Sequence, residues 1–540
     1  MENKKLGVML DCSRNSVMSI DGLKRFIVNL EKMGYNLLQL YTEDTYEIPE
    51  EPLFGYLRGR YSQKEIREID AFAKEHGIEL QPCIQTLAHL TSIFLWNRFK
   101  PLLDAGGTLL AEEEETYQLI DNMFKSISNS YSTKTVNIGM DEAMLLGAGK
   151  YFRKHGYKPK FDIFMNHLSR VSEIAKKYGF NLLMWGDMFF RIINGGIYYP
   201  TNGQKSKVVP KEIRERLPDN VSLIYWDYYT DDQKVYEDMI DRHRDFGKEI
   251  WFAGGAWKWQ GFHSGNKLSF GRIKKSIKAC TKKCVNNVVL TMWGDGGNEV
   301  PANAVLPSLL YASECVKGNF GIKNLKQKFS EIFNENLDDF MLLDMRREDC
   351  EQRCVDTSCG AKEFLYGDTF LGKFDSTVVG DEKDFFIKME RKFRRAKNRS
   401  KNFAYIFSSY EKLCKVMKVK YDLGLRTRKA YDSKDKEQLL NVIKDHLTVI
   451  KYVQEFIEHF RQMWFTDSKP HGFDIQDIRL GGVIQRLKAN RQRLIDYLNG
   501  KVESIPELEE KLTGVLLGDQ QKKIPTFNSY DGVSTPNTLW

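Results

Sequence analysis

The sequence predicts an α/β protein, a (β/α)8 TIM barrel followed by a C-terminal, mainly α-helical domain. Two observations support this prediction. In the first 320 residues, short apolar runs alternate with amphipathic segments of helical period, and the length holds eight such units. Beyond residue 320 apolar runs become scarce, and long charged segments of helical period follow. We therefore expect a barrel at 1–320, a helical domain at 321–523 and a C-terminal tail at 524–540.

The eight apolar runs are nearly continuous in apolar and β-branched residues, as expected of strands buried on both faces. They are Leu6–Cys12, Asn36–Thr42, Glu79–Gln85, Thr135–Glu142, Asn181–Asp187, Val221–Tyr228, Glu249–Ala256 and Asn287–Asp295. The helical segments are Ser19–Lys32, Gln63–His76, Glu113–Ser128, Phe161–Tyr178, Gln233–Phe246, Ser269–Cys284 and Ala302–Val316. This alternation implies parallel pairing through right-handed crossovers. No Gly-x-Gly-x-x-Gly follows the first strand, which removes the main dinucleotide-binding alternative.

In the helical domain, we predict long helical segments at Glu382–Leu413 and Lys436–Trp464. The domain follows the barrel without a low-complexity linker, so we expect it to pack on the barrel. The run from Trp464 to Gly482 is dense in specific residue types, and we expect it near the barrel mouth. A homodimer remains an open alternative, because helical C-terminal domains often dimerise.

The composition excludes several classes of protein. Hydrophobic residues make up 42% and charged residues 29% of the chain, the balance of a soluble globular protein. The net charge of +8 comes from 81 basic and 73 acidic residues spread along the chain, without a basic stripe, so we predict no nucleic-acid partner. No run approaches the roughly 18 apolar residues of a membrane span, and Leu6–Leu10 is too short for a signal-peptide core. We expect a cytoplasmic protein without a membrane partner.

Nine cysteines, an odd number in a large chain, do not resemble a disulfide framework. The pairs Cys280/Cys284 and Cys350/Cys354 are spaced i,i+4, which could in principle hold a metal. Because no paired histidine or second Cys-x-x-Cys accompanies them, we predict ordinary thiols. We expect neither a metal nor an organic cofactor.

Candidate functional residues gather at the predicted strand ends, where barrel enzymes place their chemistry. Six of the eight ends carry a carboxylate, and four carry Trp or Tyr. A single Asp there is often a helix N-cap, a single Trp is often core, and a lone His89 is as readily structural as catalytic. Their convergence on one face favours a carbohydrate site, because carboxylates and Arg bind sugar hydroxyls while Trp faces cover the ring.

Three segments then carry a family resemblance. Val136-Asn-Ile-Gly-Met-Asp-Glu142 resembles the catalytic strand of glycoside hydrolase family 20, the β-N-acetylhexosaminidases, which has Gly-x-Asp-Glu at the end of strand four. Leu10-Asp-Cys-Ser-Arg14 resembles the family's Leu-Asp-x-Ser-Arg on strand one, and Met292-Trp-Gly-Asp295 resembles its Met-Trp-Gly-Glu on strand eight. The match covers about residues 5–300. The whole chain resembles a compact bacterial branch of the family with a helical C-terminal domain.

The resemblance implies an exo-β-N-acetylhexosaminidase that hydrolyses terminal non-reducing β-linked GlcNAc or GalNAc from an oligosaccharide or glycoconjugate. Catalysis would be retaining and substrate-assisted, through an oxazolinium intermediate. Glu142 would be the general acid and base, Asp141 would hold the acetamido N–H, and Tyr228 would donate to the acetamido oxygen. The implied substrate-binding residues are Arg14, Glu43, Asp44, His89, Trp185, Asp187, Asp227, Trp257, Trp293 and Asp295.

The sequence departs from the family pattern at two places that matter for the site. Asp295 is one methylene shorter than the usual glutamate. The family's His-Trp-His run after strand two is replaced by Tyr41-Thr-Glu-Asp-Thr-Tyr46, which leaves the partner of His89 open between Glu43 and Asp44. The alternatives for the function are a barrel glycosidase acting on another sugar and a sugar-binding barrel without catalysis.

Overall fold

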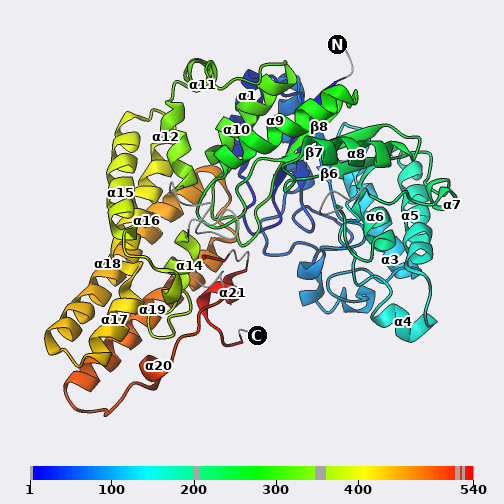
Figure 1. The fold of residues 1–540 in the computed structure, drawn as a ribbon. Helices are drawn as coiled ribbons and strands as arrows, with labels where there is room; N and C mark the ends of the chain where they lie inside the picture. Colours follow the sequence, from blue (N-terminus) through cyan, green and yellow to red (C-terminus); the bar gives the residue numbers. More distant parts are fainter. Residues whose placement is uncertain (1–3, 200–205, 347–359, 517–522, 526–528, 539–540) are drawn as a thin grey trace.

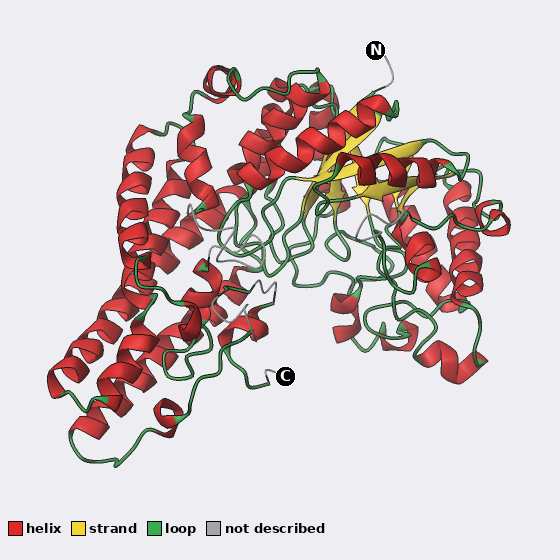
Figure 2. Cartoon of the chain, viewed as in Figure 1, coloured by secondary structure: helices red, strands yellow, loops and turns green. Residues whose placement is uncertain are grey.

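The computed structural model describes residues 4–199, 206–346, 360–516, 523–525 and 529–538. A β/α barrel lies beside an elongated set of helices, and the strands are confined to the barrel (Figures 1 and 2). The eight strands are all parallel and close into a barrel in sequence order, β1 to β8. The predicted fold class, a barrel with a C-terminal helical region, is confirmed.

Each predicted strand is present, but each ends between one and five residues before the predicted end. The strands are β1 Lys5–Asp11, β2 Leu37–Tyr41, β3 Glu79–Cys83, β4 Thr135–Asn137, β5 Asn181–Trp185, β6 Val221–Trp226, β7 Ile250–Gly255 and β8 Asn287–Met292. The shortening is greatest at β4, because Gly139 (φ 71°) and Met140 (φ 65°) adopt the left-handed conformation and cannot continue a strand. Most predicted functional residues after these ends therefore lie in loops, whereas Asp187 begins the helix Asp187–Ile193.

The barrel helices surround the strands. They are α1 Ile20–Met33, α2 Gln63–Glu75, α3 Glu114–Ser128, α4 Lys150–His155, α5 Lys160–Lys177, α6 Asp187–Ile193, α7 Lys211–Arg214, α8 Gln233–Arg244, α9 Asn266–Lys282 and α10 Leu306–Val316, with 3-10 turns at Thr91–Leu95, Lys100–Leu102 and Ala302–Val305. Local sequence explains boundaries such as the start of α2, where Ser62 and Glu65 form a reciprocal capping box. The sequence predicts no bounds for a helix between β5 and β6, where the structure has the short α6 and α7.

The C-terminal elements are almost entirely helical. They are α11 Leu325–Phe333, α12 Leu337–Met341, α14 Ala361–Tyr366, α15 Glu382–Arg399, α16 Ala404–Lys420, α17 Leu423–Asp432, α18 Lys436–Asp467, α19 Phe473–Leu498, α20 Pro506–Glu509 and α21 Tyr530–Ser534, with 3-10 turns at Leu342–Asp344 and Asp375–Thr377. The segment predicted as one long helix from Glu382 is two helices, α15 and α16. At the break, Glu335 accepts hydrogen bonds from the N–H groups of Lys401 and Asn402, a contact from a distant part of the chain.

Residues 524–540, predicted as a tail, contain α21, whose Val533 is fully buried. Of the cysteines in the i,i+4 pairs, Cys280 is buried and Cys284 is exposed, and both are free thiols. Cys350 and Cys354 lie outside the described residues. Within the described ranges, no helix is both long enough and apolar enough to cross a membrane.

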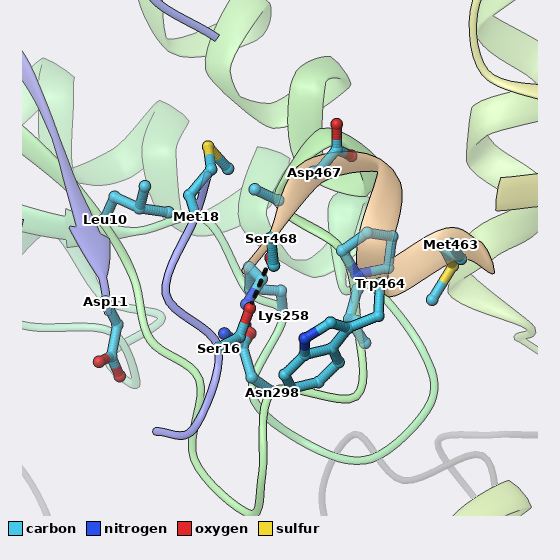
Figure 3. Close-up of a pocket in the computed structure, with 13 residues that line it drawn as sticks. Leu10, Asp11, Ser16, Met18, Lys258, Asn298, Met463, Trp464, Asp467 and Ser468 are labelled. Atoms are coloured by element: carbon cyan, nitrogen blue, oxygen red, sulfur yellow. Dashed lines mark hydrogen bonds between the residues drawn. The ribbon is translucent and has the colours of Figure 1, made fainter. Parts of the chain in front are cut away.

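The end of α18 contacts the loop that follows β1, as expected of the Trp464–Gly482 run. Ser16 Oγ and Ser468 Oγ are 2.8 Å apart, and Figure 3 shows this hydrogen bond at the edge of a cavity between the two parts of the molecule. The Ser19 N–H donates to the Asp467 carbonyl oxygen at 2.9 Å, and the Lys469 N–H donates to the Val17 carbonyl oxygen at 2.8 Å. The helical region therefore holds the β1 loop directly.

Candidate active site

A pocket with about 510 Å³ of empty volume opens at the carboxyl ends of the strands. The residues that line it are Arg14, Tyr41, His89, Asp141, Glu142, Trp185, Trp226, Tyr228, Tyr229, Trp259, Trp293 and Asp295. All eight strands or the loops that follow them contribute. Eight of these twelve are residues that the sequence singled out, so the predicted convergence of carboxylates and aromatic rings is present in the structure.

The Gly-x-Asp-Glu segment is shaped by its contact with Gln85 at the end of β3. A Cβ on Gly139 would lie 2.1 Å from Gln85 Oε1, so only glycine leaves room for this side chain. Gln85 Oε1 accepts from the Met140 N–H at 3.2 Å, and its Nε2 donates to Asp141 Oδ1 at 2.7 Å. One buried amide therefore fixes both the turn and the first acid of the pair.

His89 pairs with the two acids. Its Nε2 lies 3.3 Å from Asp141 Oδ2 and 3.8 Å from Glu142 Oε2, distances of an ion pair without the alignment of a hydrogen bond. Burial would lower the pKa of His89, but the Asp141 carboxylate outweighs it, and the pKa is raised to about 9. Burial would likewise raise the pKa of Asp141, yet the His89 charge and the Gln85 hydrogen bond lower it. At neutral pH the pair is a partly exposed imidazolium and a buried carboxylate.

Glu142 differs sharply from its neighbour. Asp141 is buried, whereas the Glu142 side chain is 45% exposed to the pocket and solvent. Its backbone is left-handed, with φ 49°, a conformation that an L-residue seldom adopts and that is common at functional sites. Arg191 Nη2 lies 3.1 Å from Glu142 Oε1, and the Glu142 N–H donates to Asp187 Oδ2 at 3.2 Å. Adjacent acids thus occupy two different environments.

The segments Leu-Asp-x-Ser-Arg and Trp-Gly-Asp meet through Asp11. Its carboxylate accepts from the Ser13 N–H at 2.8 Å and from the Gly294 N–H at 2.9 Å, joining the loops after β1 and β8. Arg14 pairs with Glu43 through a charge-assisted hydrogen bond. Burial raises the pKa of Asp295, and the Arg14 cation opposes the rise. Because Asp11 joins the loops after β1 and β8, Arg14 and Asp295 lie on the same side of the pocket.

Aromatic rings form the rest of the wall. Trp293 packs edge-on against Tyr41 at 4.7 Å between ring centroids, and Trp185 lies 6.2 Å from Trp293. The Trp185 indole N–H is buried and has no hydrogen-bond partner in the described part of the chain. Tyr228 stacks on Trp226 at 5.2 Å, and burial raises its pKa well above the usual range, so its hydroxyl stays protonated.

Two family models match the chain. The Glycosyl hydrolase family 20 catalytic domain matches residues 6–226, and the Glycoside Hydrolase 20C C-terminal domain matches residues 338–524. The chain belongs to glycoside hydrolase family 20. The first model includes the acid pair of the pocket, and the second matches the helical region.

Known proteins of similar sequence are the hexosaminidases D of Bos taurus and Homo sapiens. The bovine protein is 24% identical over 285 residues, which cover 48% of this chain and 76% of the relative. The human protein is 25% identical over 241 residues, 42% of this chain and 46% of the relative. The chain therefore spans about half the length of the human protein.

Solved structures of family 20 proteins are also similar. The Flavobacterium johnsoniae chitobiase is 16% identical with a TM-score of 0.46, over 93% of this chain and 73% of the other. The Vibrio harveyi GH20 exo-β-N-acetylglucosaminidase is 14% identical with a TM-score of 0.43, over 59% of this chain and 54% of the other.

Five residues predicted to bind substrate stand behind the pocket wall in this family 20 structure. They are Glu43, Asp44, Asp187, Asp227 and Trp257. Glu43 binds Arg14, and Asp44 binds Arg58 at 3.1 Å. Asp187 is fully buried beside Arg191, and Asp227 accepts from the N–H groups of Tyr229 and Thr230. Trp257 stacks on Trp259 at 4.3 Å. Glu43, Asp187, Asp227 and Trp257 thus contact residues that line the pocket, and substrate binding by the five residues stays a prediction.

The partner of His89 is neither of the two residues left open. Asp44 is engaged by Arg58, and Glu43 by Arg14 and the Tyr41 hydroxyl, although Glu43 still acts on His89 through its charge. The ion-pair contacts of His89 are with Asp141 and Glu142 themselves. The described residues hold no cluster of three or more His, Cys, Asp or Glu side chains arranged to bind a metal.

Four pocket residues were not among the predicted site residues. They are Tyr41, Trp226, Tyr229 and Trp259. All four lie at or just after strand ends, so the same positional rule would have found them. The rule does not say which of Trp257 and Trp259 turns inward. Gln85 and Arg191 contact the acids without lining the pocket, and no motif in the sequence marks them.

Proposed function

We propose that this protein is an exo-acting β-N-acetylhexosaminidase that releases terminal β-linked GlcNAc or GalNAc by substrate-assisted, retaining catalysis. The observation that carries the proposal is the pair Asp141–Glu142 at one strand end, one acid buried and ion-paired and the other open to the pocket. Ordinary retaining glycosidases need two carboxyl groups about 5 Å apart on opposite faces of the sugar. Adjacent residues of one strand end suit the alternative, in which the sugar's acetamido oxygen is the nucleophile.

In the first step the Glu142 carboxyl gives its proton to the glycosidic oxygen as the bond from that oxygen to C1 breaks. The acetamido oxygen forms a new bond to C1, and positive charge develops on the acetamido nitrogen. The Asp141 carboxylate accepts the acetamido N–H and stabilises this charge, and the low pKa of Asp141 keeps it ionised for the task. The Tyr228 hydroxyl donates to the acetamido oxygen and holds it in line with C1.

In the second step the Glu142 carboxylate removes a proton from water, which attacks C1 from the side that the leaving group vacated. The oxazolinium ring opens, and the sugar leaves with its β configuration retained. Arg14 and Asp295 bind ring hydroxyls, and Trp185 and Trp293 cover the acetamido group and the ring, so the pocket takes a chain end. GlcNAc and GalNAc differ only in the configuration of the C4 hydroxyl. This hydroxyl would lie on the side of the pocket that carries Arg14 and Asp295.

The direct test pairs aryl β-glycosides that do and do not carry the 2-acetamido group. We expect hydrolysis of the N-acetylglucosaminide and none of the glucoside, because only the former carries the nucleophile.

Asp141→Asn and Glu142→Gln should each lower kcat on a natural disaccharide by on the order of 10² to 10⁴. Glu142→Gln should cost less on an activated aryl glycoside, whose leaving group needs little protonation. Asp162→Asn, at an exposed ion pair with Arg216, is the matched control.

Equal cleavage of both aryl glycosides would contradict this proposal and would indicate a glycosidase that acts on another sugar. Thermal stabilisation by N-acetylglucosamine without turnover of any substrate would replace it by a sugar-binding barrel.

A further inference from the structure

Helix α6 begins directly after β5 and places a buried ion pair against Glu142. Asp187, its first residue, accepts from Arg191 Nε one turn later at 2.8 Å. Arg191 Nη2 lies 3.1 Å from Glu142 Oε1, and Asp187 Oδ2 accepts from the Glu142 N–H at 3.2 Å. The pair therefore contacts both the backbone and the side chain of the residue to which the proposed function gives the proton transfer.

The surroundings leave Arg191 little freedom. Its Nη1 donates to the Gly196 carbonyl oxygen at 3.1 Å, and its guanidinium lies over the rings of Tyr198 and Trp226 at 5.7 and 5.8 Å from their centroids. Arg191 does not line the sugar pocket, and Asp187 is completely buried. Both residues contact Glu142, and Asp187 also interacts with Asp141 through its charge.

The contact with Arg191 occupies one oxygen of Glu142, and the other oxygen faces His89. Oε1 is held by the guanidinium, whereas Oε2 lies on the side of His89, a pocket residue, 3.8 Å from its Nε2. Resting on the proposed function, we infer that Asp187 and Arg191 are positioning residues that select Oε2 of Glu142 as the oxygen that carries the proton and balance the charge around it.

The charges of the pair oppose each other at Glu142. The Arg191 cation favours the Glu142 carboxylate that forms when the proton leaves Oε2 for the glycosidic oxygen. The Asp187 anion disfavours that carboxylate and partly neutralises the Arg191 cation. The charged groups that face Glu142 are His89, Asp141, Asp187, Arg191 and Asp295.

Asp187 itself is affected by its burial. Burial and then the Asp141 charge raise the pKa of Asp187 to about 7, against the Arg191 cation. Asp187 is therefore ionised on the alkaline side of neutrality. Besides Asp141, Arg191 and Glu142, the ionisable group that faces it is the Tyr198 hydroxyl.

The test is the dependence of kcat on pH for phenyl β-N-acetylglucosaminide, a substrate with a poor leaving group. Arg191→Gln removes the cation and should move the alkaline limb up by about one pH unit. Asp187→Asn keeps an oxygen for the Glu142 N–H but removes the anion, so it should move the same limb down. Each should lower kcat on the phenyl glycoside about tenfold or more, and less on the 2,4-dinitrophenyl glycoside.

Two further variants make the outcome decisive. Arg191→Lys keeps the charge without the planar fork, so we expect a lowered kcat with the wild-type limb. Arg170→Gln, at an exposed pair with Glu114 on α5, should change neither. The inference would be wrong if the wild type is active and the alkaline limb of the kcat profile stays in place in both Arg191→Gln and Asp187→Asn. It would also be wrong if the limb moves in the same direction in the two variants. A wild type that hydrolyses neither N-acetylglucosaminide would instead overturn the proposed function.

Discussion

Gly139 organises the acid pair by the side chain that it lacks. Its φ of 71° places the chain in the left-handed region, and the space where a Cβ would stand is filled by the Gln85 amide that holds Asp141. Two separate demands for glycine therefore coincide at one position. In the Gly-x-Asp-Glu segment, the glycine leaves room for Gln85, and the two acids supply the chemical groups.

We predict that Gly139→Ala displaces Gln85 and lowers kcat by about 100-fold or more, because Asp141 then loses its orientation. The control is Gly77→Ala, at a similar φ of 69° but with nothing within 4 Å of the new Cβ. Both variants should lose about 1–2 kcal/mol of unfolding free energy from the left-handed backbone. Steady-state kinetics and urea unfolding separate the two effects. Wild-type activity in Gly139→Ala would show that the Gln85 contact does not position Asp141.

At this scale the sequence predicts which residue types reach the barrel mouth but not how each side chain turns. Asp44 and Asp227 were predicted to face the sugar because they follow strand ends. The structure instead gives each a local partner, Arg58 for Asp44 and backbone N–H groups for Asp227, because a buried carboxylate must be satisfied. Glu43, His89 and Glu142 have left-handed backbone conformations, which their residue types do not predict.

Among the elements, the junction of α18 and α19 holds the loop that carries Arg14. The Asp467 carboxylate binds Arg25 at 3.1 Å, Asn303 at 3.1 Å and the Tyr405 hydroxyl at 2.6 Å, while its carbonyl oxygen caps the loop at Ser19. Gly472 passes so close that a Cβ would lie 2.0 Å from the Asn15 carbonyl oxygen. The position of Arg14 thus depends on residues more than 450 positions away.

We predict that Asp467→Ala raises KM by about 5–10-fold with less than about a twofold change in kcat, because a looser loop weakens the grip of Arg14 on the sugar at a cost of about 1 kcal/mol. The control is Asp477→Ala, which removes an exposed pair with Arg461 on the same two helices. Steady-state kinetics on a GlcNAc disaccharide provide the measurement. An unchanged KM in Asp467→Ala would show that Arg14 keeps its place without this contact.

The strands could be predicted because a buried parallel strand has a local sequence signal, a short run of apolar and β-branched residues. The break between α15 and α16 could not, because Glu335, some 65 residues earlier, binds the backbone at the break. The short α6 was missed because its seven residues are too few for a helical period to show. That helix carries Asp187 and Arg191.

At the scale of the whole molecule, the barrel and the helical region share one buried interface. Phe262, in the loop after β7, packs against Tyr366, Phe456 and Phe460 of the helical region. Asp344 accepts from the N–H groups of Asn266 and Lys267 and so caps α9 of the barrel from outside it. We therefore expect the two parts to unfold together.

Calorimetry should show a single unfolding transition. Phe262→Ala should lower the free energy of unfolding by about 3–5 kcal/mol, because the substitution removes a large buried side chain from the interface between the two parts. Phe152→Ala, at a half-exposed position on α4, should cost little. Two separate transitions in the wild type, or a Phe262→Ala effect confined to one of them, would contradict a shared interface.

The change of hydrophobic period near residue 320 predicts two regions but says little of how they dock. Docking relies on contacts between residues far apart in the sequence, such as the buried pair of Lys362 and Glu299 at 3.2 Å. Either residue alone reads as an ordinary surface charge.

The acid pair after β4, with Asp141 holding the sugar's own amide and Glu142 moving the proton, is the central claim. Its most direct test is ¹H NMR of the product in the first minutes of hydrolysis of a β-linked GlcNAc disaccharide, before mutarotation. Attack by the acetamido oxygen followed by water requires two inversions at C1, so the first sugar released should be the β anomer. Release of the α anomer would mean a single displacement by water, and the roles assigned to Asp141 and Glu142 would be wrong.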